Sequence, residues 1–479
     1  MTTSTKEANS ESILSDIAIN AELADYSPVK GCMVIRPHGY AIWESIQKIL
    51  DKMIKDTGHE NAYFPLLVPE SFLQKEAEHV EGFAPECAVV TQAGGKELNE
   101  KYVIRPTSET IINHMFSKWV GSYRDLPLKL NQWANVMRWE MRTRLFLRTS
   151  EFLWQEGHTC HSTHEEAKKE VMQMINVYKD LLENYLAVPV HIGEKTDSEK
   201  FAGALDTFTI EALMRDGKAL QAGTSHDLGQ NFAKAFDTTF TSQENKLDYV
   251  WQTSWGVSTR LIGAIIMGHN DEVGLILPPK IAPFQVVIIP ILKKNMDNSL
   301  VLEKSKELKS QLEQLDIRVK LDDRTQISQG HKFNEYEQKG IPIRLVVGAR
   351  DLENNQVEIH RRDIQSKEKG VPLENLDNRI KDLLDEIQNS LLNRALEFRN
   401  KRTKTVTSIE ELDSVLNCEG GFARAMWNGD TELEKILKEK FSASIRCLPL
   451  EKELSEDTPC LFSGTISSEN KEIMIAKAY

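Results

Sequence analysis

The hydrophobic positions indicate two amphipathic helices in the N-terminal half of the chain. Between residues 41 and 56, apolar side chains recur at helical spacing, and the apolar stretch 62–71 that follows is typical of a strand. Residues 163–185 predict a longer helix with a continuous apolar face. Thr163 and Glu166 have the spacing of a capping box, so we expect this helix to begin beside Thr163.

A hairpin is predicted between these helices, and further strands follow them. The hairpin consists of residues 131–141 and 146–158, separated by a short basic segment that suits a reversal. A strand that begins near residue 219 is expected to break into a loop at 223–226, where Gly, Thr, Ser and His follow one another. Another strand is expected to end near Trp255, before a helix at 261–266 that has almost no polar face and should be buried.

The pattern changes after residue 282. An apolar strand at 284–292 is followed by alternating helices and strands up to about residue 400, which predicts a small α/β domain with a mixed sheet. The chain is therefore expected to divide into domains at 1–282, 283–400 and 401–479. Its 479 residues, 40% of them hydrophobic, suffice for packed cores of this kind.

Charge and cysteine usage narrow the class of protein. The formal net charge of -13 argues against a protein that binds nucleic acid over its whole surface, although it leaves room for a local basic site. Six scattered cysteines argue against a secreted disulfide framework and fit a reducing cytosol. The N-terminus lacks the features of a signal peptide, and the longest apolar run, 284–292, is too short to span a bilayer. We therefore expect a soluble, cytoplasmic protein with no membrane role.

The predicted hairpin carries several arginines interleaved with aromatic residues. Guanidinium groups bind phosphate and also stack on aromatic planes, and a nucleotide offers both partners. Taken alone, the arginines are better explained by a charged, solvated hairpin, whereas the interleaved aromatic residues favour a nucleotide site. The arginines are Arg138, Arg142, Arg144 and Arg148.

This hairpin, at about 131–158, resembles motif 2 of the class II aminoacyl-tRNA synthetases. The string RWE followed by LRTSEFLWQEGH is similar in particular to the prolyl-tRNA synthetase family. The resemblance implies that Arg138 binds the α-phosphate of ATP and the amino-acid carboxylate. It also implies that Arg148 holds ATP further along and that Glu140 orients its adenine end.

Two earlier segments extend the resemblance. Residues 41–70, with Pro65 in the matching place, are similar to motif 1, which forms the dimer interface in that family and so implies a homodimer. Thr107 and Glu109 lie two apart, so on an extended loop both side chains project to the same side and can hold an ammonium group. Taken alone, this string is better explained as a helix cap. The resemblance assigns it to the substrate amine and assigns Phe83 to the proline pocket.

Later segments complete the expected substrate site. The resemblance implies that Gln221 and Thr224 contact ATP. A histidine in such a Gly/Thr/Ser segment, taken alone, is more often structural. The resemblance nevertheless assigns the remaining proline-binding positions to Trp154, Glu156, His158, Phe201, His226 and Ser258.

The segment 251–279 resembles motif 3 and supplies another cation. An arginine at the start of an apolar helix is unfavourable because the positive end of the helix dipole lies there, and an anionic ligand resolves that conflict. By the resemblance this residue, Arg260, binds the γ-phosphate of ATP, although an ordinary salt bridge explains it equally well when it is taken alone. Arg138 and Arg260 are accordingly the expected catalytic residues, and ATP and Mg²⁺ the expected cofactors.

The activity that the resemblance implies is activation of L-proline as an adenylate, followed by transfer to tRNA(Pro). Catalysis of this kind is mostly positioning and electrostatic stabilisation. Only about ninety residues separate His158 from Trp251, which leaves no room for the editing insertion of longer family members. The chain therefore resembles the short archaeal/eukaryotic-like type. A pocket for proline discriminates weakly against alanine, so mischarging with alanine, uncorrected in cis, is expected.

Residues 283–400 resemble the class IIa anticodon-binding domain. The resemblance puts Glu337, Arg344, Arg350 and Asp351 at the positions that read anticodon bases. Arg and Asp side chains can pair with guanine edges, which is the physical reason to expect them there. For each residue individually, a solvated strand end is an equal alternative.

Residues 401–479 resemble a C-terminal domain that in this family often binds zinc through four cysteines. Here Asn428, Leu433 and Ser463 stand at three of the ligand positions, and only Cys460 remains. Because structural zinc needs about four N or S ligands, we expect no metal.

The expected fold class is an α+β catalytic domain with a class II synthetase antiparallel sheet, followed by an α/β anticodon-binding domain and a small α/β C-terminal domain. Two alternatives stay open. One is another class IIa synthetase, against which the apolar set Phe83, Trp154 and Phe201 argues. The other is a catalytically inactive tRNA-binding paralogue, against which the intact arginines of motifs 2 and 3 argue.

Overall fold

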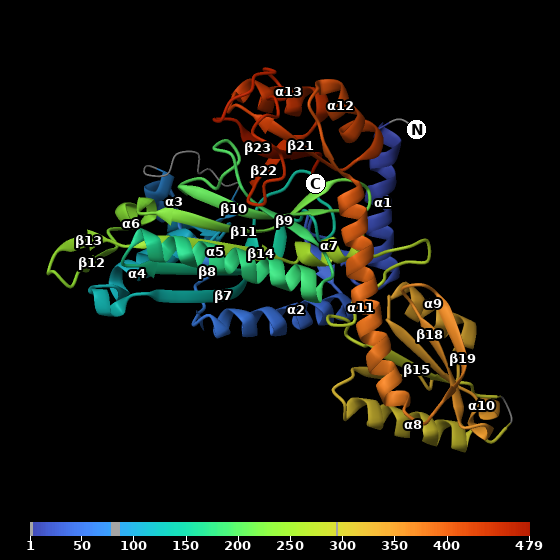
Figure 1. Cartoon of the computed structure of the whole chain (residues 1–479). Coiled ribbons are helices and arrows are strands. Elements are labelled where there is room, and N and C mark those ends of the chain that lie inside the picture. The colour runs from blue at the N-terminus through green and yellow to red at the C-terminus, as the bar shows by residue number, and fades with distance from the viewer. Residues whose placement is uncertain (1–2, 78–86, 294–295) are drawn as a thin grey trace.

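The chain folds around three large hydrophobic cores, seen in a computed structural model that describes residues 3–77, 87–293 and 296–479 (Figure 1). The largest core lies between a central sheet and the helices of the N-terminal half. The second lies in the region coloured yellow to orange, and the third in the red C-terminal region. This arrangement confirms the expected fold class, with its three successive parts.

An eleven-stranded sheet forms the centre of the molecule. Its central strands all pair antiparallel, as expected for the catalytic part. In spatial order they are β7 (Leu128–Met137), β8 (Glu151–His161), β14 (Trp251–Ser258), β11 (Ala219–Gly229), β10 (Asp206–Leu213) and β9 (Val190–Glu194). Beyond β7 the sheet ends in a parallel two-residue strand, β3 (Glu60–Asn61).

Helices cover one face of this sheet. The predicted long helix is α5 (His164–Asp180), which crosses strands β8 to β10 and ends in a π-helical turn at Leu181–Tyr185. Its capping box between Thr163 and Glu166 is present as predicted. Three further helices contribute to the same core: α1 (Thr3–Asn20), α2 (Pro37–Asp56) and α7 (Arg260–Gly268).

The C-terminal region extends the same sheet. Leu448 and Pro449 pair with Glu194 and Gly193 of β9, so the last strands of the chain continue the catalytic sheet. These strands are, in spatial order, β22 (Ser444–Pro449), β23 (Lys471–Ala476), β21 (Phe422–Trp427) and β20 (Thr403–Thr405). The helical segments around them are α12 (Ile409–Asp413), a π-helical turn at Ser414–Glu419, and α13 (Thr431–Phe441).

The region that follows α7 contains the predicted mixed sheet. Two of its four strand pairings are parallel and two are antiparallel. The spatial order of the strands is β16 (Val319–Leu321), β15 (Val286–Pro290), β17 (Ile343–Val347), β18 (Gln356–Arg361) and β19 (Ser366–Pro372). The helices are α8 (Ser299–Glu313), α9 (Gln329–Gln338), α10 (Ala349–Glu353) and α11 (Leu376–Lys401). Helix α11 runs from this domain up to the C-terminal region (Figure 1).

Smaller elements complete the described chain. Three small sheets contain β1 (Ala24–Tyr26) with β2 (Met33–Ile35), β12 (Thr239–Thr241) with β13 (Leu247–Tyr249), and β4 (Leu67–Pro69) with β6 (Lys96–Ile104) and β5 (Val89–Ala93). The remaining helices are α3 (Glu70–Ala77), α4 (Glu109–Trp119), a 3₁₀ turn at Tyr123–Asp125, and α6 (Asn231–Phe236). Among the described residues, no helix has the length and apolar character needed to cross a bilayer. All six cysteines lie in the described part of the chain, and no disulfide joins any of them.

Two boundaries differ from those predicted. Residues 223–226, predicted as a loop, lie in the middle of β11, because β10 and β14 pair with this segment on both sides. Strand β14 likewise continues beyond Trp255 to Ser258, where it still pairs with β8. The connection of the hairpin is also longer than predicted and comprises residues 138–150, because the pairing between its two strands stops at Met137 and Glu151. For residues 223–226 and for β14, pairing with distant strands decides the boundary.

Several buried histidines predict the response of the fold to acid. Burial lowers their pKa values, whereas in the unfolded chain they titrate near the ordinary value of about 6.5. The unfolded state therefore binds more protons below pH 6.5, and stability is lost as the pH falls toward 4. We expect a melting temperature about 5 to 10 °C lower at pH 5 than at pH 7.5 by calorimetry, and equal values would contradict this account. The histidines are His161, His269 and His360, with pKa values of about 4, and His191 and His226, with values of about 3.

Candidate functional site

The register of the central sheet aligns polar side chains from four strands on one face. His158 lies opposite Ser254, Ser254 lies opposite His226, and His226 lies opposite Thr207. Side chains alternate between the faces of a strand, so these four point to the same side. Trp255, the next residue of β14, is buried in the core on the other side. The sheet thus presents a polar floor.

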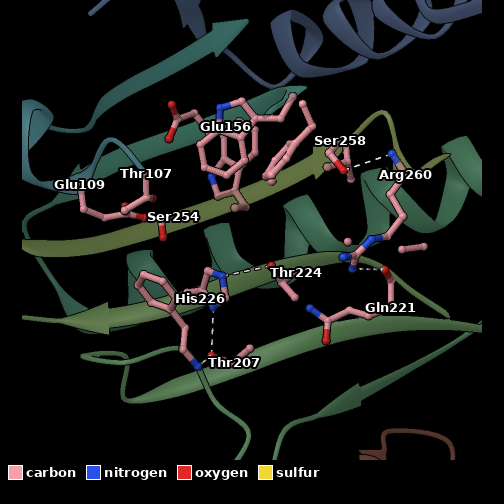
Figure 2. Close-up of a pocket in the computed structure, with 18 of the residues that line it drawn as sticks. Thr107, Glu109, Glu156, Thr207, Gln221, Thr224, His226, Ser254, Ser258 and Arg260 are labelled. Carbon is pink, nitrogen blue, oxygen red and sulfur yellow. Dashed lines mark hydrogen bonds between the residues drawn. The ribbon is translucent and has the colours of Figure 1, made fainter. Parts of the chain in front are cut away.

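A cavity of about 510 Å³ lies over this floor (Figure 2). Its volume is within the usual range for small-molecule sites. Most of the residues that the sequence assigned to ATP or proline line it: Thr107, Glu109, Arg138, Trp154, Glu156, His158, Phe201, Gln221, Thr224, His226, Ser258 and Arg260. Segments spread over more than 150 positions therefore meet in one space.

One end of the cavity is acidic. Glu109 is the first residue of α4, and Thr107 directs its hydroxyl to the carboxylate oxygen Oε2 of Glu109. Both side chains are buried. Among the described residues, none donates a hydrogen bond to the other oxygen, Oε1, so the carboxylate can still accept one from a cation. The predicted extended loop is corrected here, since the pair spans the start of a helix.

A second buried carboxylate, Glu156, is already saturated with partners. Ser108 is the N-cap of α4, but its hydroxyl donates to Oε1 of Glu156 at 2.5 Å instead of capping the helix. Gln132 donates to the same oxygen at 2.8 Å, and the Nε2 atom of His158 lies 2.9 Å from Oε2. Burial alone opposes protonation of His158, but this contact and the charge of Glu156 raise its pKa on balance. Glu156 therefore supports the site from behind, whereas Glu109 faces it.

His226 is held in a fixed orientation at the cavity wall. Its ring nitrogens lie 2.9 Å from the hydroxyl of Thr207 and 3.0 Å from that of Thr224. Burial, together with the nearby His158 and Arg138, lowers the pKa of His226 to about 3, so the ring is neutral at pH 7. The ring of Phe201 lies 4.7 Å away between centroids. This wall is therefore uncharged and partly aromatic.

The opposite part of the cavity carries two guanidinium groups. Arg138 donates from Nε to the carbonyl oxygen of Pro106 at 2.9 Å and lies over the rings of Phe152 and Trp154. Although its side chain is exposed at the cavity, the protein packed around the guanidinium lowers its pKa. The second guanidinium, that of Arg260, donates hydrogen bonds to backbone oxygens of Leu147 and Gln221. Because of burial and the neighbouring cations, the pKa of Arg260 falls to about 10, so its guanidinium remains charged at pH 7 and favours an anion.

Arg260 owes its orientation to backbone carbonyl groups from two distant segments. Its Nε donates to the carbonyl oxygen of Leu147 at 3.1 Å, and one terminal nitrogen donates to that of Gln221 at 3.3 Å (Figure 2). Its backbone amide donates to the hydroxyl of Ser258 at 3.2 Å. In the described chain no carboxylate forms a salt bridge with Arg260, so the alternative of an ordinary salt bridge is not supported.

Two polar atoms in the cavity wall lack a partner among the described residues. These are the indole Nε1 of Trp154 and the hydroxyl of Ser254. Buried polar atoms are almost always hydrogen-bonded in folded proteins. Such atoms at a cavity are therefore candidates to bind a ligand.

Two described residues that the sequence assigned to ATP, Arg148 and Glu140, do not line the cavity. Arg148 and Glu140 form an ion pair with each other at 2.7 Å on the hairpin connection, where both side chains reach solvent. Phe83 lies outside the described residues. Because Arg148 and Glu140 are paired with each other, a ligand that binds either side chain must compete with this ion pair.

Sequence reasoning missed eleven of the residues that line the cavity, among them two charged side chains, two hydroxyl-bearing side chains and one phenylalanine. Ser254 and Phe152 follow the period-two alternation of their strands, so counting back from Ser258 and Trp154 would have found them, whereas Thr207 is placed by its pairing with His226. Lys195 and Glu199 lie on an irregular segment after β9, and no pattern marks them. These five residues are Phe152, Lys195, Glu199, Thr207 and Ser254.

The four residues assigned to anticodon reading fall into two places of the mixed-sheet domain. Arg344 donates to Oε1 of Glu337 at 2.7 Å and lies over the ring of Phe333 at 4.1 Å. Arg350 and Asp351 lie in α10, beyond the other end of β17. The structure therefore brings Glu337 and Arg344 into contact, whereas Arg350 and Asp351 lie apart from that pair.

In the C-terminal region, the four positions that correspond to zinc ligands in the family have different environments. Leu433 is fully buried in the hydrophobic core of this region. Burial alone raises the pKa of the Cys460 thiol, but hydrogen bonds from Ser463 and from the backbone near Asn428 lower it on balance. Among the described residues, no group of three His, Cys, Asp or Glu side chains has the geometry to hold a metal ion.

Comparison with known proteins covers the whole of this architecture. Three family models match the chain: the tRNA synthetase class II core domain (G, H, P, S and T) at residues 90–269, an anticodon binding domain at 285–383, and the prolyl-tRNA synthetase C-terminal domain at 409–479. Curated relatives named "Proline--tRNA ligase" are similar over 470 residues, which is 97% of this chain and 96% of each relative. Identity is 58% for the protein of Chloroherpeton thalassium and 57% for those of Chlorobium phaeobacteroides and Prosthecochloris aestuarii.

Proposed function

Because the chain belongs to the prolyl-tRNA synthetase family, we propose that it is a proline--tRNA ligase that activates L-proline with ATP and transfers it to tRNA(Pro). One observation carries this proposal. A single cavity of about 510 Å³ combines the buried carboxylate of Glu109, the rings of Trp154 and Phe201, and the guanidinium groups of Arg138 and Arg260. A small apolar amino acid and a polyphosphate need this combination.

The acidic end is suited to the proline amine. Glu109 and Thr107 offer a carboxylate and a hydroxyl, which complement a secondary ammonium group. Trp154, Phe201 and the neutral His226 would surround the apolar ring of proline. Glu156 and His158 hold this wall together, and their proposed role is support of the pocket.

The cationic end is suited to the nucleotide. We assign Arg138 to the proline carboxylate and the α-phosphate, and Arg260 to the γ-phosphate, with Gln221 and Thr224 as further ATP contacts. The carboxylate attacks the α-phosphorus and pyrophosphate leaves, so negative charge on the equatorial oxygens is stabilised by these cations. Mg²⁺ normally binds through the phosphates with one or two carboxylates, and Glu199 is the cavity residue of that chemistry beyond the two buried carboxylates. Because the phosphates and water supply the other ligands, one carboxylate such as that of Glu199 would suffice to bind Mg²⁺.

The second step requires tRNA at the same cavity. The 3'-hydroxyl of the terminal ribose attacks the carbonyl carbon of the adenylate, and AMP leaves. We propose that the domain matching the anticodon-binding model reads the anticodon with Glu337, Arg344, Arg350 and Asp351. The paired Glu337 and Arg344 offer an acceptor and donors to base edges.

We further infer the short type of the family and a homodimer. The segment from β8 to β14 contains only α5, α6 and strands that belong to the catalytic sheet or a small hairpin, which supports a site without a separate editing domain. The motif 1 region, 41–70, exposes Tyr63 and Leu67, which supports an interface there. Light scattering tests the dimer, and the mass of a single chain at micromolar concentration would contradict it.

We also infer that the C-terminal region folds without zinc. Leu433 fills the core at a former ligand position, and only Cys460 remains of the four cysteines. Structural zinc contributes folding energy directly, so removing it would unfold such a domain. We expect dialysis against EDTA to change the melting temperature by less than about 1 °C, while a larger fall that zinc reverses would contradict the inference.

The decisive experiment for the function is amino-acid-dependent exchange between pyrophosphate and ATP, measured with all twenty amino acids and without tRNA. We expect strong exchange with proline and a weaker signal with alanine, because a pocket that merely contacts the substrate discriminates poorly against a smaller one. Exchange with a different amino acid would indicate another class IIa specificity. No exchange with any amino acid would indicate an inactive paralogue.

A further inference from the structure

Three charged side chains, two from the catalytic part and one from the C-terminal region, form a buried cluster beside the cavity. Lys195 donates from Nζ to Oε1 of Glu211 at 3.0 Å and to the backbone oxygen of Arg446 at 2.7 Å. The Arg446 guanidinium donates to both oxygens of Glu211, at 3.1 and 3.3 Å. Exposed fractions are 5% for Lys195, 0% for Glu211 and 7% for Arg446. One carboxylate thus joins two cations from separate parts of the chain.

Arg446 occupies an irregular position of its strand. The pairing of β22 with β23 shifts register between Ile445 and Cys447, so Arg446 is the extra residue of a bulge. Bulges turn a side chain away from the regular alternation and are common near active sites. Two residues further along, Leu448 pairs with Glu194, the residue before Lys195. This strand pairing therefore places Arg446 close to Lys195, the first residue after β9.

The segment after β9, residues 195–205, contributes two cavity residues besides Lys195. Glu199 and Phe201 both line the cavity, and the ring of Phe201 packs on His226. The segment contains no strand or regular helix, so its position depends on individual contacts, among them the hydrogen bond of 3.0 Å from the Phe201 amide to the hydroxyl of Thr207. At the far end, Leu205 donates its amide to the carbonyl oxygen of Asp227 at 2.7 Å. At the near end, the charged cluster provides the anchor.

A second contact from the C-terminal region reaches the same segment. Ser198 donates its hydroxyl to Oε1 of Glu434, which lies on α13, at 2.7 Å. The segment is therefore held by the C-terminal region at two points, Lys195 and Ser198. Burying three charges is costly compared with apolar packing, so a cluster of this kind is poorly explained by stability alone.

We propose that Arg446 is a positioning residue for the amino-acid end of the cavity. Acting through Glu211 and Lys195, it fixes the segment 195–205 and thereby the ring of Phe201. The C-terminal region then helps to position the wall of the amino-acid pocket. This inference rests on the proposed function, because Phe201 has been assigned there to the wall of the proline site.

The test compares two buried arginines of the C-terminal sheet in the full-length chain. Arg446→Met removes the proposed anchor. Arg424→Met is the matched control, because Arg424 is also buried and pairs with a buried carboxylate, Glu472, but no described contact joins it to residues 195–205. We expect both variants to lower the melting temperature. Only Arg446→Met should accelerate amide hydrogen exchange in peptides covering 195–205, by on the order of tenfold.

The kinetic readout is pyrophosphate exchange. For Arg446→Met we expect the KM for proline to rise on the order of tenfold while the KM for ATP stays within about twofold, because a small misplacement of one wall affects only the ligand that touches it. Arg446→Lys keeps a cation beside Glu211 and should recover part of the loss. If the residues act through one cluster, adding Lys195→Met to Arg446→Met should cost less than the product of the two single effects.

The two readouts separate the inference from the function on which it rests. Unchanged hydrogen exchange at 195–205 in Arg446→Met, or equal changes in both arginine variants, would overturn the inference. A chain that activates no proline would overturn the proposed function, yet hydrogen exchange would still decide whether Arg446 holds the segment. If Arg446→Met does not fold, Ser198→Ala removes the second contact at an exposed position and should accelerate exchange in the same peptides without changing the melting temperature. No acceleration in that variant would count against the inference.

Discussion

Replacing Arg138 with glutamine is expected to lower kcat for proline-dependent pyrophosphate exchange about a thousandfold. Arg138 is held by the carbonyl oxygen of Pro106 and by two aromatic rings, so its charge is oriented before the substrates bind. Glutamine retains a polar group but loses the positive charge that the developing phosphoryl charge requires. The measurement is steady-state exchange at saturating proline and ATP.

A matched control lies on the same hairpin connection. Arg142 is exposed and does not line the cavity, so Arg142→Gln removes an equal charge a few residues away. We expect its kcat to stay within about twofold of the original value, because exposed charges in solvent contribute little. Equal losses in both variants would mean that general electrostatic attraction, and not the placement of Arg138, accounts for the effect.

The second large effect is expected for Glu109→Gln, which should raise the KM for proline about a hundredfold and leave that for ATP nearly unchanged. Glu109 is buried, and one of its oxygens remains open to the cavity, so the variant would leave a buried ammonium group without its counter-charge. Losing one partner of a desolvated charge pair typically costs about 2 to 5 kcal/mol. Exchange kinetics with each substrate varied in turn provide the measurement.

Glu156→Gln is the informative comparison for Glu109. Glu156 is equally buried, but its oxygens are occupied by Ser108, Gln132 and His158. We expect this variant to lower the melting temperature more than Glu109→Gln does and to raise the KM for proline less. If the KM for proline rose more in Glu156→Gln than in Glu109→Gln, Glu156 and not Glu109 would be the carboxylate that binds the proline amine.

Sequence reasoning located most of the site because the chemistry lies in short strings. Arg138, Trp154 and Glu156 belong to one such string, and each lines the cavity. The family resemblance identified these residues, but it did not indicate which hydrogen bonds each of them forms. Whether Glu109 or Glu156 has a free oxygen depends on hydrogen bonds from Ser108 and Gln132, which come from other segments.

The errors share a physical cause. Residues 223–226 contain Gly, Thr, Ser and His and have the composition of a loop, yet they are a strand because β10 and β14 pair with both of their edges. Local propensity is weak compared with such pairing. The cluster around Glu211 was missed for the same reason. Lys195 and Arg446 are 251 positions apart, and only the tertiary fold brings them together.

The strands at the two edges of the central sheet are very short. β3 has two residues and β20 has three, so few backbone groups at either edge remain open to pairing with another chain. Removing the C-terminal region would instead expose one side of β9, a five-residue strand whose outer side pairs with β22 in the full-length chain. An unprotected strand of that length is a template for aggregation. The C-terminal region therefore also keeps the protein from self-association through its sheet, and shortened versions of the chain should be handled as aggregation-prone.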